Sequence, residues 1–190
     1  MHYLIGGTFL FFFAHSISMI SEKWRDERVQ NWGAIRWKAV YSLVSIVGFV
    51  LICWGYGLAR QNPIILFDPH PYTRYFSIIL MLPVFPLFLA ASFPGKIKTR
   101  FKHPLLVATK IWAFCHLISN GTLADTILFS SFLVWAILNR ISMKRREQRP
   151  ILGAPDSKYN DIIVVTLGIA IYVCFVLWIH KALFAVAVIY

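Results

Sequence analysis

Long apolar runs separated by short polar stretches constrain this chain more than any other feature of its sequence. Each run approaches the roughly 20 residues that a helix needs to cross the hydrocarbon core of a bilayer. Helices are expected throughout, because every backbone N–H and C=O must be paired inside the hydrocarbon. The expected spans are residues 3–20, 40–58, 75–93, 104–118, 123–138 and 162–179. The sequence therefore predicts an all-α, polytopic transmembrane bundle of about six spans, in a single domain over residues 1–190.

The composition indicates that lipid, and not water, solvates most of the surface. Hydrophobic residues make up 58% of the 190 residues, and charged residues only 14%. A soluble domain of this length would be roughly a quarter charged. So few charges could not cover the outside of a water-surrounded fold, and membrane lipids are therefore the expected surroundings of the chain.

Proline and glycine mark two expected irregularities. Pro83 and Pro86 fall inside the third expected span and should kink it, because neither has a backbone N–H to donate. Asn120 and Gly121 indicate a tight turn between the fourth and fifth spans. Asp125 follows at the start of the fifth span, where the helix dipole favours a negative charge.

The formal net charge of +11 is concentrated in alternate loops, which indicates membrane topology and not a nucleic-acid partner. The basic residues are Lys23, Arg25, Arg28, Arg36 and Lys38 after the first span, Lys96, Lys98, Arg100 and Lys102 after the third, and Arg140, Lys144, Arg145, Arg146, Arg149 and Lys158 after the fifth. Loops rich in Lys and Arg stay in the cytoplasm. The pattern therefore predicts both termini outside the cytoplasm, with anionic headgroups as partners of the charges.

Polar residues inside the spans are the candidate functional residues, because they are costly in hydrocarbon. They are His15, Lys110 and His116. Lys110 can extend its long side chain to the cytoplasmic interface, and a lone buried histidine is often only a hydrogen-bonded core residue. Two histidines in different spans nevertheless favour a shared ligand.

Each of these histidines shares a helix face with aromatic or small residues. At helical spacing, His15 lies with Thr8, Phe11, Phe12 and Met19, and His116 lies with Thr109, Trp112, Ala113 and Asn120. Such walls suit a flat macrocycle, and they equally suit ordinary helix packing. The faces alone therefore leave both interpretations open.

Several segments carry a resemblance to a known family. They are HPLLVATKIWAFCHLISNG at 103–121, LFSSFLVWA at 128–136, RISMKRR at 140–146 and AHS at 14–16. Together they resemble the NnrU family, and the resemblance covers nearly the whole chain. That family is associated with bacterial denitrification, through expression of nitrite and nitric oxide reductase activity. The resemblance implies a multi-pass protein of the bacterial inner membrane.

The resemblance also implies a cofactor. The plant enzyme 15-cis-zeta-carotene isomerase is similar to this family and uses haem b held by two histidines. By that similarity His15 and His116 correspond to the haem ligands, with Trp112, Ala113 and Asn120 beside the cofactor. The plant enzyme has a cysteine at the position of Ala113. The resemblance therefore implies haem binding more directly than it implies isomerase activity. The implied task is redox-related, either isomerisation or sensing, with nitrogen-oxide reductases or electron-transfer proteins as partners.

Two other functions stay open at this point. One is a non-enzymatic membrane assembly or regulatory factor without haem, in which the histidines only form hydrogen bonds. The other is a membrane methyltransferase, because Lys102-His103-Pro104 is similar to a segment of the isoprenylcysteine enzymes. Those enzymes carry a later acidic pair that helps to bind S-adenosylmethionine, whereas the corresponding region here has the single carboxylate of Glu147.

Overall fold

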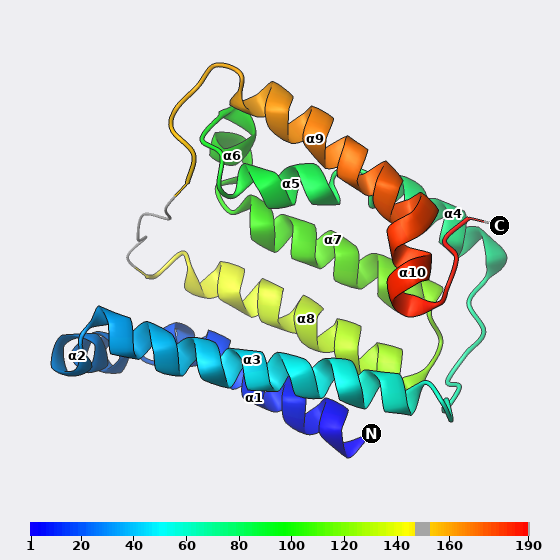
Figure 1. Cartoon of the computed structure of the whole chain (residues 1–190), viewed down its shortest axis with the longest axis horizontal. Helices are drawn as coiled ribbons and strands as arrows, with labels where there is room; N and C mark the ends of the chain where they lie inside the picture. The colour runs from blue at the N-terminus through cyan, green and yellow to red at the C-terminus, as the bar shows by residue number, and fades with distance from the viewer. Residues whose placement is uncertain (147–152, 190) are drawn as a thin grey trace. The chain divides into compact units, whose positions relative to one another are not determined.

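The computed structural model describes residues 1–146 and 153–189, and this part of the chain is mainly helical (Figure 1). The helices are α1 (His2–Ile20), α2 (Glu22–Trp32), α3 (Ala34–Ala59), α4 (Pro71–Leu80), α5 (Val84–Ala90), α6 (Lys96–Phe101), α7 (Pro104–Ser119), α8 (Leu123–Ser142), α9 (Asn160–Cys174), the π-helical η1 (Phe175–Ile179) and α10 (His180–Phe184). The expected all-α fold is confirmed.

Among the residues that the structure describes, five helical segments are long and apolar enough to cross a membrane. They are His2–Ile20, Ala34–Ala59, Pro71–Ala90, Leu123–Ser142 and Asn160–Phe184. The fourth expected span is the shorter apolar helix α7, with 16 residues. At about 1.5 Å per residue it is roughly 24 Å long, a little less than the hydrocarbon thickness of about 30 Å.

The third span is broken where proline predicts a kink. α4 ends at Leu80, α5 begins at Val84, and Pro83 is the residue that precedes α5. Pro86 does not break the helix, because it lies in the first turn of α5. Proline is tolerated there, since the backbone N–H groups of a first turn have no intrahelical acceptor.

The chain forms two compact units, each built from two separate segments. The first unit comprises residues 1–68 and 120–147, and the second comprises residues 69–119 and 148–190. In the first unit α1 packs along α3, and α8 contacts α1. In the second unit α5 packs against both α7 and α9, and α4 contacts α7.

Glycines let α1 and α3 approach backbone to backbone. A Cβ atom at Gly48 would lie 2.7 Å from the Phe11 nitrogen, and one at Gly7 would lie 2.6 Å from the Ile52 nitrogen. A Cβ atom at Gly55 would overlap the backbone of Leu4. Small residues at such crossings are a common device in membranes, where close van der Waals contact drives helix association.

The second unit combines a close helix approach at a glycine with hydrogen bonds. A Cβ atom at Gly168 of α9 would lie 2.5 Å from the nitrogen of Pro86 on α5. Asp161, at the start of α9, accepts hydrogen bonds from the backbone amides of Lys96 and Ile97, at 2.9 and 3.1 Å. These contacts fix α9 against α5 and against the basic segment that begins at α6.

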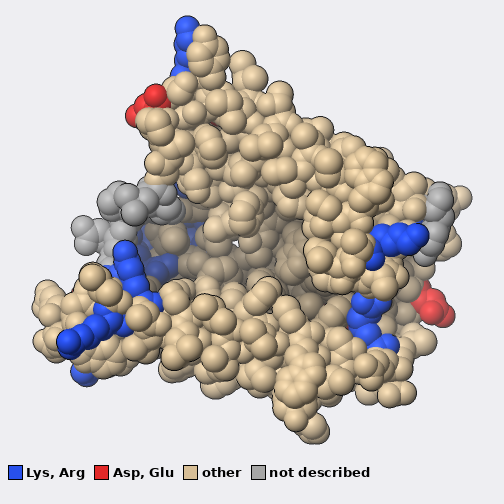
Figure 2. Space-filling model, in the orientation of Figure 1, with Lys and Arg blue, Asp and Glu red and all other residues tan. Residues whose placement is uncertain are grey.

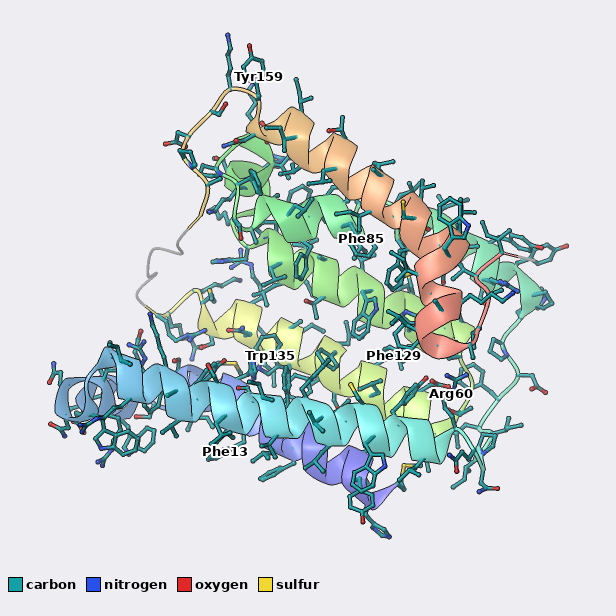
Figure 3. All side chains as sticks on the ribbon, in the orientation of Figure 1. Phe13, Arg60, Phe85, Phe129, Trp135 and Tyr159 are labelled. Atoms are coloured by element: carbon teal, nitrogen blue, oxygen red, sulfur yellow. The ribbon has the colours of Figure 1, made fainter. Side chains whose placement is uncertain are left out.

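Large apolar side chains cover the outside of the helices. Phe9 is 72% exposed and Ile79 is 67% exposed, and many other large apolar side chains are exposed as well. Exposing so much apolar surface to water would be unfavourable. Phe13 on α1 is a further example (Figure 3). Lys, Arg, Asp and Glu occupy little of the surface in view, and most of it is uncharged (Figure 2). This surface is suited to lipid.

The α1–α3 contact makes a direct prediction about stability. We expect Gly55→Ala to lower the free energy of unfolding by about 1–3 kcal/mol, because the new methyl group meets backbone atoms that cannot move aside. Gly57→Ala is the matched control, since nothing lies within 4 Å of a Cβ atom there. Unfolding in detergent measures both variants. Equal stability of the two would contradict the close approach.

The charge pattern makes a prediction about topology. We expect both termini outside the cytoplasm, because Lys and Arg gather in the segments that follow the first, third and fifth spans. A reporter that is active only in the periplasm should work when fused to either terminus. A cytoplasmic C-terminus with an external N-terminus would contradict six spans in this orientation.

Candidate functional site

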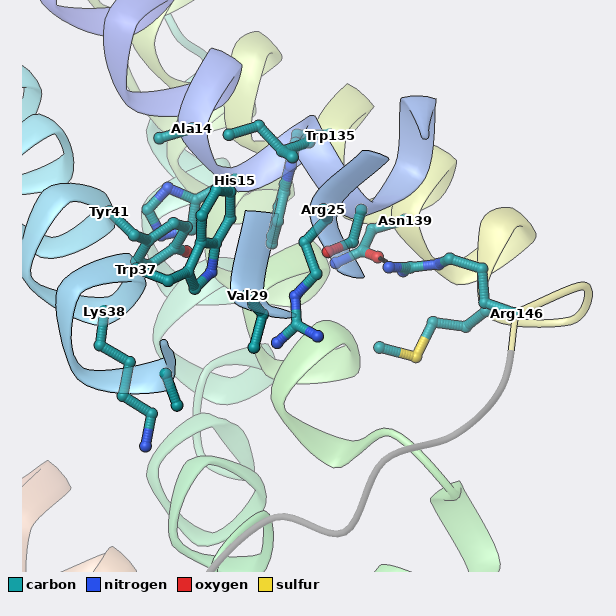
Figure 4. A pocket seen from close by; sticks show the side chains of 14 residues that line it. Ala14, His15, Arg25, Val29, Trp37, Lys38, Tyr41, Trp135, Asn139 and Arg146 are labelled. Carbon is teal, nitrogen blue, oxygen red and sulfur yellow. Dashed lines mark hydrogen bonds between the residues drawn. The ribbon is translucent and has the colours of Figure 1, made fainter. Parts of the chain in front are cut away.

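A pocket of about 410 Å³ lies within the first unit (Figure 4). Residues of α1, α2, α3, the C-terminal half of α8 and the segment that follows α8 line it. They are Ala14, His15, Ile17, Ser18, Arg25, Val29, Ala34, Trp37, Lys38, Tyr41, Trp135, Asn139, Met143 and Arg146. The pocket thus contains one of the two histidines that the sequence marks as candidates.

The turn between α1 and α3 builds one wall of this pocket. α1 ends at Ile20, and the Ser21 hydroxyl caps α2 by accepting a hydrogen bond from the Trp24 amide, at 3.2 Å. Gly33 then adopts φ 83°, a conformation that favours glycine, and the chain turns into α3. This turn places Arg25 and Val29 of α2 at the pocket that α1 and α3 also line.

His15 is held by its own helix and by aromatic rings. Its Nδ1 donates a hydrogen bond to the Phe11 carbonyl oxygen, at 2.8 Å. Its ring stacks on that of Phe11, with centroids 4.1 Å apart, and lies 5.4 Å from the Tyr41 ring and 5.9 Å from the Trp135 ring. A carbonyl oxygen only accepts, so Nδ1 carries the proton. In the neutral ring Nε2 therefore bears the lone pair that a metal needs.

Trp135 gives the pocket an unsatisfied donor. Its indole Nε1 is buried and has no hydrogen-bond partner within residues 1–146 and 153–189. Such a group usually finds a partner when buried, and leaving it without one costs about 1–3 kcal/mol. Trp37 is also buried and lines the same pocket. The aromatic wall thus combines an apolar surface with a donor that a ligand could satisfy.

Three cationic side chains line the pocket, each from a different part of the first unit. Arg25 pairs with Asp26, its neighbour in sequence, at 2.7 Å. Arg146 donates from Nη2 to Asn139 Oδ1 at 2.6 Å, and its buried Nε has no partner in the part of the chain that the structure describes. Lys38 is exposed at the edge. Since no described Asp or Glu lines the pocket, its field is positive.

Of the other predicted site residues, Trp112, Ala113 and His116 lie in the second unit, whereas Asn120 begins the second segment of the first unit. His116 is on α7, with its ring 5.5 Å from that of Trp112 in an edge-to-face arrangement. Ala113 is fully buried one turn earlier on α7, and Asn120 follows its last residue. The structure therefore describes the surroundings of His15 and of His116 separately, and the sharing of one ligand stays a prediction.

The described residues contain no group of three or more His, Cys, Asp or Glu side chains that could hold a metal ion by themselves. A haem does not require such a group, because its porphyrin supplies four nitrogen ligands and the protein adds only axial ones. A single well-placed histidine is therefore enough to begin a haem site.

Sequence reasoning missed most of the residues around His15. Phe11 was expected beside it, but Trp37 and Tyr41 come from α3 and Trp135 comes from α8. In the sequence alone, the basic residues of the pocket indicate only membrane topology. The AHS and LFSSFLVWA segments, both part of the family resemblance, contain His15 and Trp135. Their shared membership of the resemblance is the sequence signal that links these two residues.

The segment that favours methyl transfer forms the junction between α6 and α7. Lys102 adopts a positive φ of 57°, and the His103 amide donates to the Phe101 carbonyl oxygen, at 2.6 Å. Glu147, the carboxylate considered for that function, lies outside the described residues. No observation on this segment favours a methyltransferase over a helix junction.

Comparison with known proteins identifies the family. The family model described as NnrU protein matches residues 3–188, nearly the whole chain. Searches of curated proteins and of solved structures found no significant match. The match also spans both units and both candidate histidines. On this match, the chain is a membrane protein that belongs to the NnrU family.

Proposed function

We propose that this protein binds haem b, with His15 as one axial ligand, and serves a redox-related task in nitrogen-oxide metabolism. The observation that carries the proposal is the state of His15. Its Nδ1 is engaged by the Phe11 carbonyl oxygen, and its Nε2 forms no hydrogen bond with the described residues. An outer hydrogen bond of this kind fixes the orientation of metal-binding histidines.

The pocket around His15 suits a flat, largely apolar cofactor. Its volume of about 410 Å³ falls in the range of about 300–1,000 Å³ that is usual for small-molecule and cofactor sites. Trp37, Tyr41 and Trp135 offer ring surfaces for a macrocycle. The unpartnered Nε1 of Trp135 and Nε of Arg146 are donors that would gain an acceptor from a bound ligand.

His116 is the proposed second axial ligand, as the family resemblance implies. It lies beside Trp112 on α7, a helix that is apolar over most of its length. Trp112, Ala113 and Asn120 would then be close to the cofactor on that side. A neutral imidazole from each of α1 and α7 would complete a six-coordinate haem of the kind used for electron transfer.

Haem would supply one-electron chemistry, and the chain's own residues would control access to it. The aromatic side chains would exclude water from the macrocycle, and His15 would be held in one tautomer by its own helix. The family association with denitrification supports a bacterial inner-membrane location and nitrogen-oxide reductases or electron-transfer proteins as partners. Sensing fits better than isomerisation, because Ala113 replaces the cysteine of the plant isomerase.

Absorption spectroscopy of the purified protein tests this proposal. We expect a low-spin, six-coordinate haem b spectrum from the wild type. His15→Gly and His116→Gly should each give a high-spin spectrum or lose haem, because one axial ligand is removed. Added imidazole should restore the low-spin spectrum of each variant, which separates ligation from a folding defect.

His70→Ala is the control, because His70 lies at the N-terminus of α4, where its Nδ1 accepts a hydrogen bond from the Tyr72 amide. Its spectrum should equal that of the wild type. A spectrum unchanged by either glycine variant would reject the ligand assignment. Protein that contains no haem after expression in haem-sufficient cells would instead support the haem-free assembly or regulatory factor.

A further inference from the structure

We propose that Arg25, Lys38 and Arg146 bind the two propionate carboxylates of the porphyrin, and that they thereby set which edge of the macrocycle enters the pocket first. This inference rests on the proposed haem function and extends it to residues that the family resemblance does not mention. Arg25 comes from α2, Lys38 from the first turns of α3, and Arg146 from the segment after α8.

The pocket is chemically two-sided. The Lys38 and Arg25 side chains extend away from the part lined by Ala14 and Trp135 (Figure 4). His15 lies with the aromatic rings and stacks on Phe11. A matching ligand has a flat apolar body and acid groups along one edge. A porphyrin with two propionates on neighbouring pyrrole rings has this distribution.

Two of the cationic side chains are also held in place, as carboxylate binding requires. Arg146 is positioned by its hydrogen bond to Asn139, a residue that is itself buried. Its Nε is buried and has no partner among residues 1–146 and 153–189, so a donor is left without an acceptor. Arg25 is held by Asp26 at 2.7 Å. Guanidinium groups fixed in this way favour carboxylate recognition, because their donors match the two oxygens.

Asp26 is the acidic residue to be weighed against these cations. It pairs with Arg25 but does not line the pocket. It neutralises part of the charge of Arg25. The charges of Lys38 and Arg146 remain available to a ligand. Anionic lipid headgroups are the competing occupant, because Lys and Arg beside a membrane attract them. The neutral detergent and the esterified porphyrin in the following experiment separate these two occupants.

The test compares two porphyrins on the full-length protein, prepared without haem in neutral detergent. Ferric haem b and its dimethyl ester are titrated in, and the Soret absorbance gives each dissociation constant. We expect the ester to bind at least about tenfold more weakly, because charge-assisted hydrogen bonds are lost. Both forms should give the same coordination spectrum, because the ester leaves His15 ligation intact.

Matched variants assign the effect to the pocket. Lys38→Gln and Arg146→Gln should each weaken haem binding by about three- to tenfold. In both variants the dissociation constant of the ester divided by that of haem should move closer to one. Lys23→Gln and Arg145→Gln are the controls, because both residues are exposed and neither lines the pocket. The controls should bind both porphyrins as the wild type does.

Three results would overturn the inference, and they are distinguishable. Equal affinity of the wild type for haem and its ester, with a low-spin spectrum, would reject propionate binding while the haem function stands. If Lys38→Gln and Arg146→Gln lower binding to phosphatidylglycerol vesicles but not to haem, the cations serve lipid instead. Absence of binding by both porphyrins would reject the haem function, and the inference with it.

Discussion

The close approach of α1 to α3 is the contact on which the rest of the first unit depends. Gly7, Gly48 and Gly55 remove the side chains that would otherwise separate the two backbones. The crossing brings the ring of His15 on α1 within 5.4 Å of the ring of Tyr41 on α3. In a bilayer, where lipid tails are as apolar as the helices, such packing is a main source of association free energy.

A buried carboxylate then ties α8 to this helix pair. Asp125 accepts hydrogen bonds from the Tyr56 hydroxyl of α3 and from the hydroxyl and amide of Thr122, which caps α8. The dipole of α8 explains an acidic residue at this position, but the bond to Tyr56 gives it a second role. With α8 fixed to α3 at this end, Trp135, Asn139 and Arg146 follow along α8 and beyond it to the pocket.

The sequence was sufficient for elements that depend on local composition. The apolar runs predicted the spans, and Pro83 predicted the break between α4 and α5. The second expected span begins at residue 40, whereas α3 begins at Ala34, because Arg36 and Lys38 interrupt the apolar run although they are helical. The pocket could not be predicted, because it joins residues of α1, α2, α3 and α8. Membrane topology alone also explains its basic residues. The sequence therefore offers no reason to expect them at one pocket.

We propose that this fold holds one haem b at His15. Pyridine haemochrome analysis of the wild-type protein, purified in mild detergent from haem-sufficient cells, tests it most directly by relating extracted haem to polypeptide. About one haem b per chain is expected, since a six-coordinate haem uses both histidines. A folded protein with no haem, and with no uptake of added haem, would contradict it.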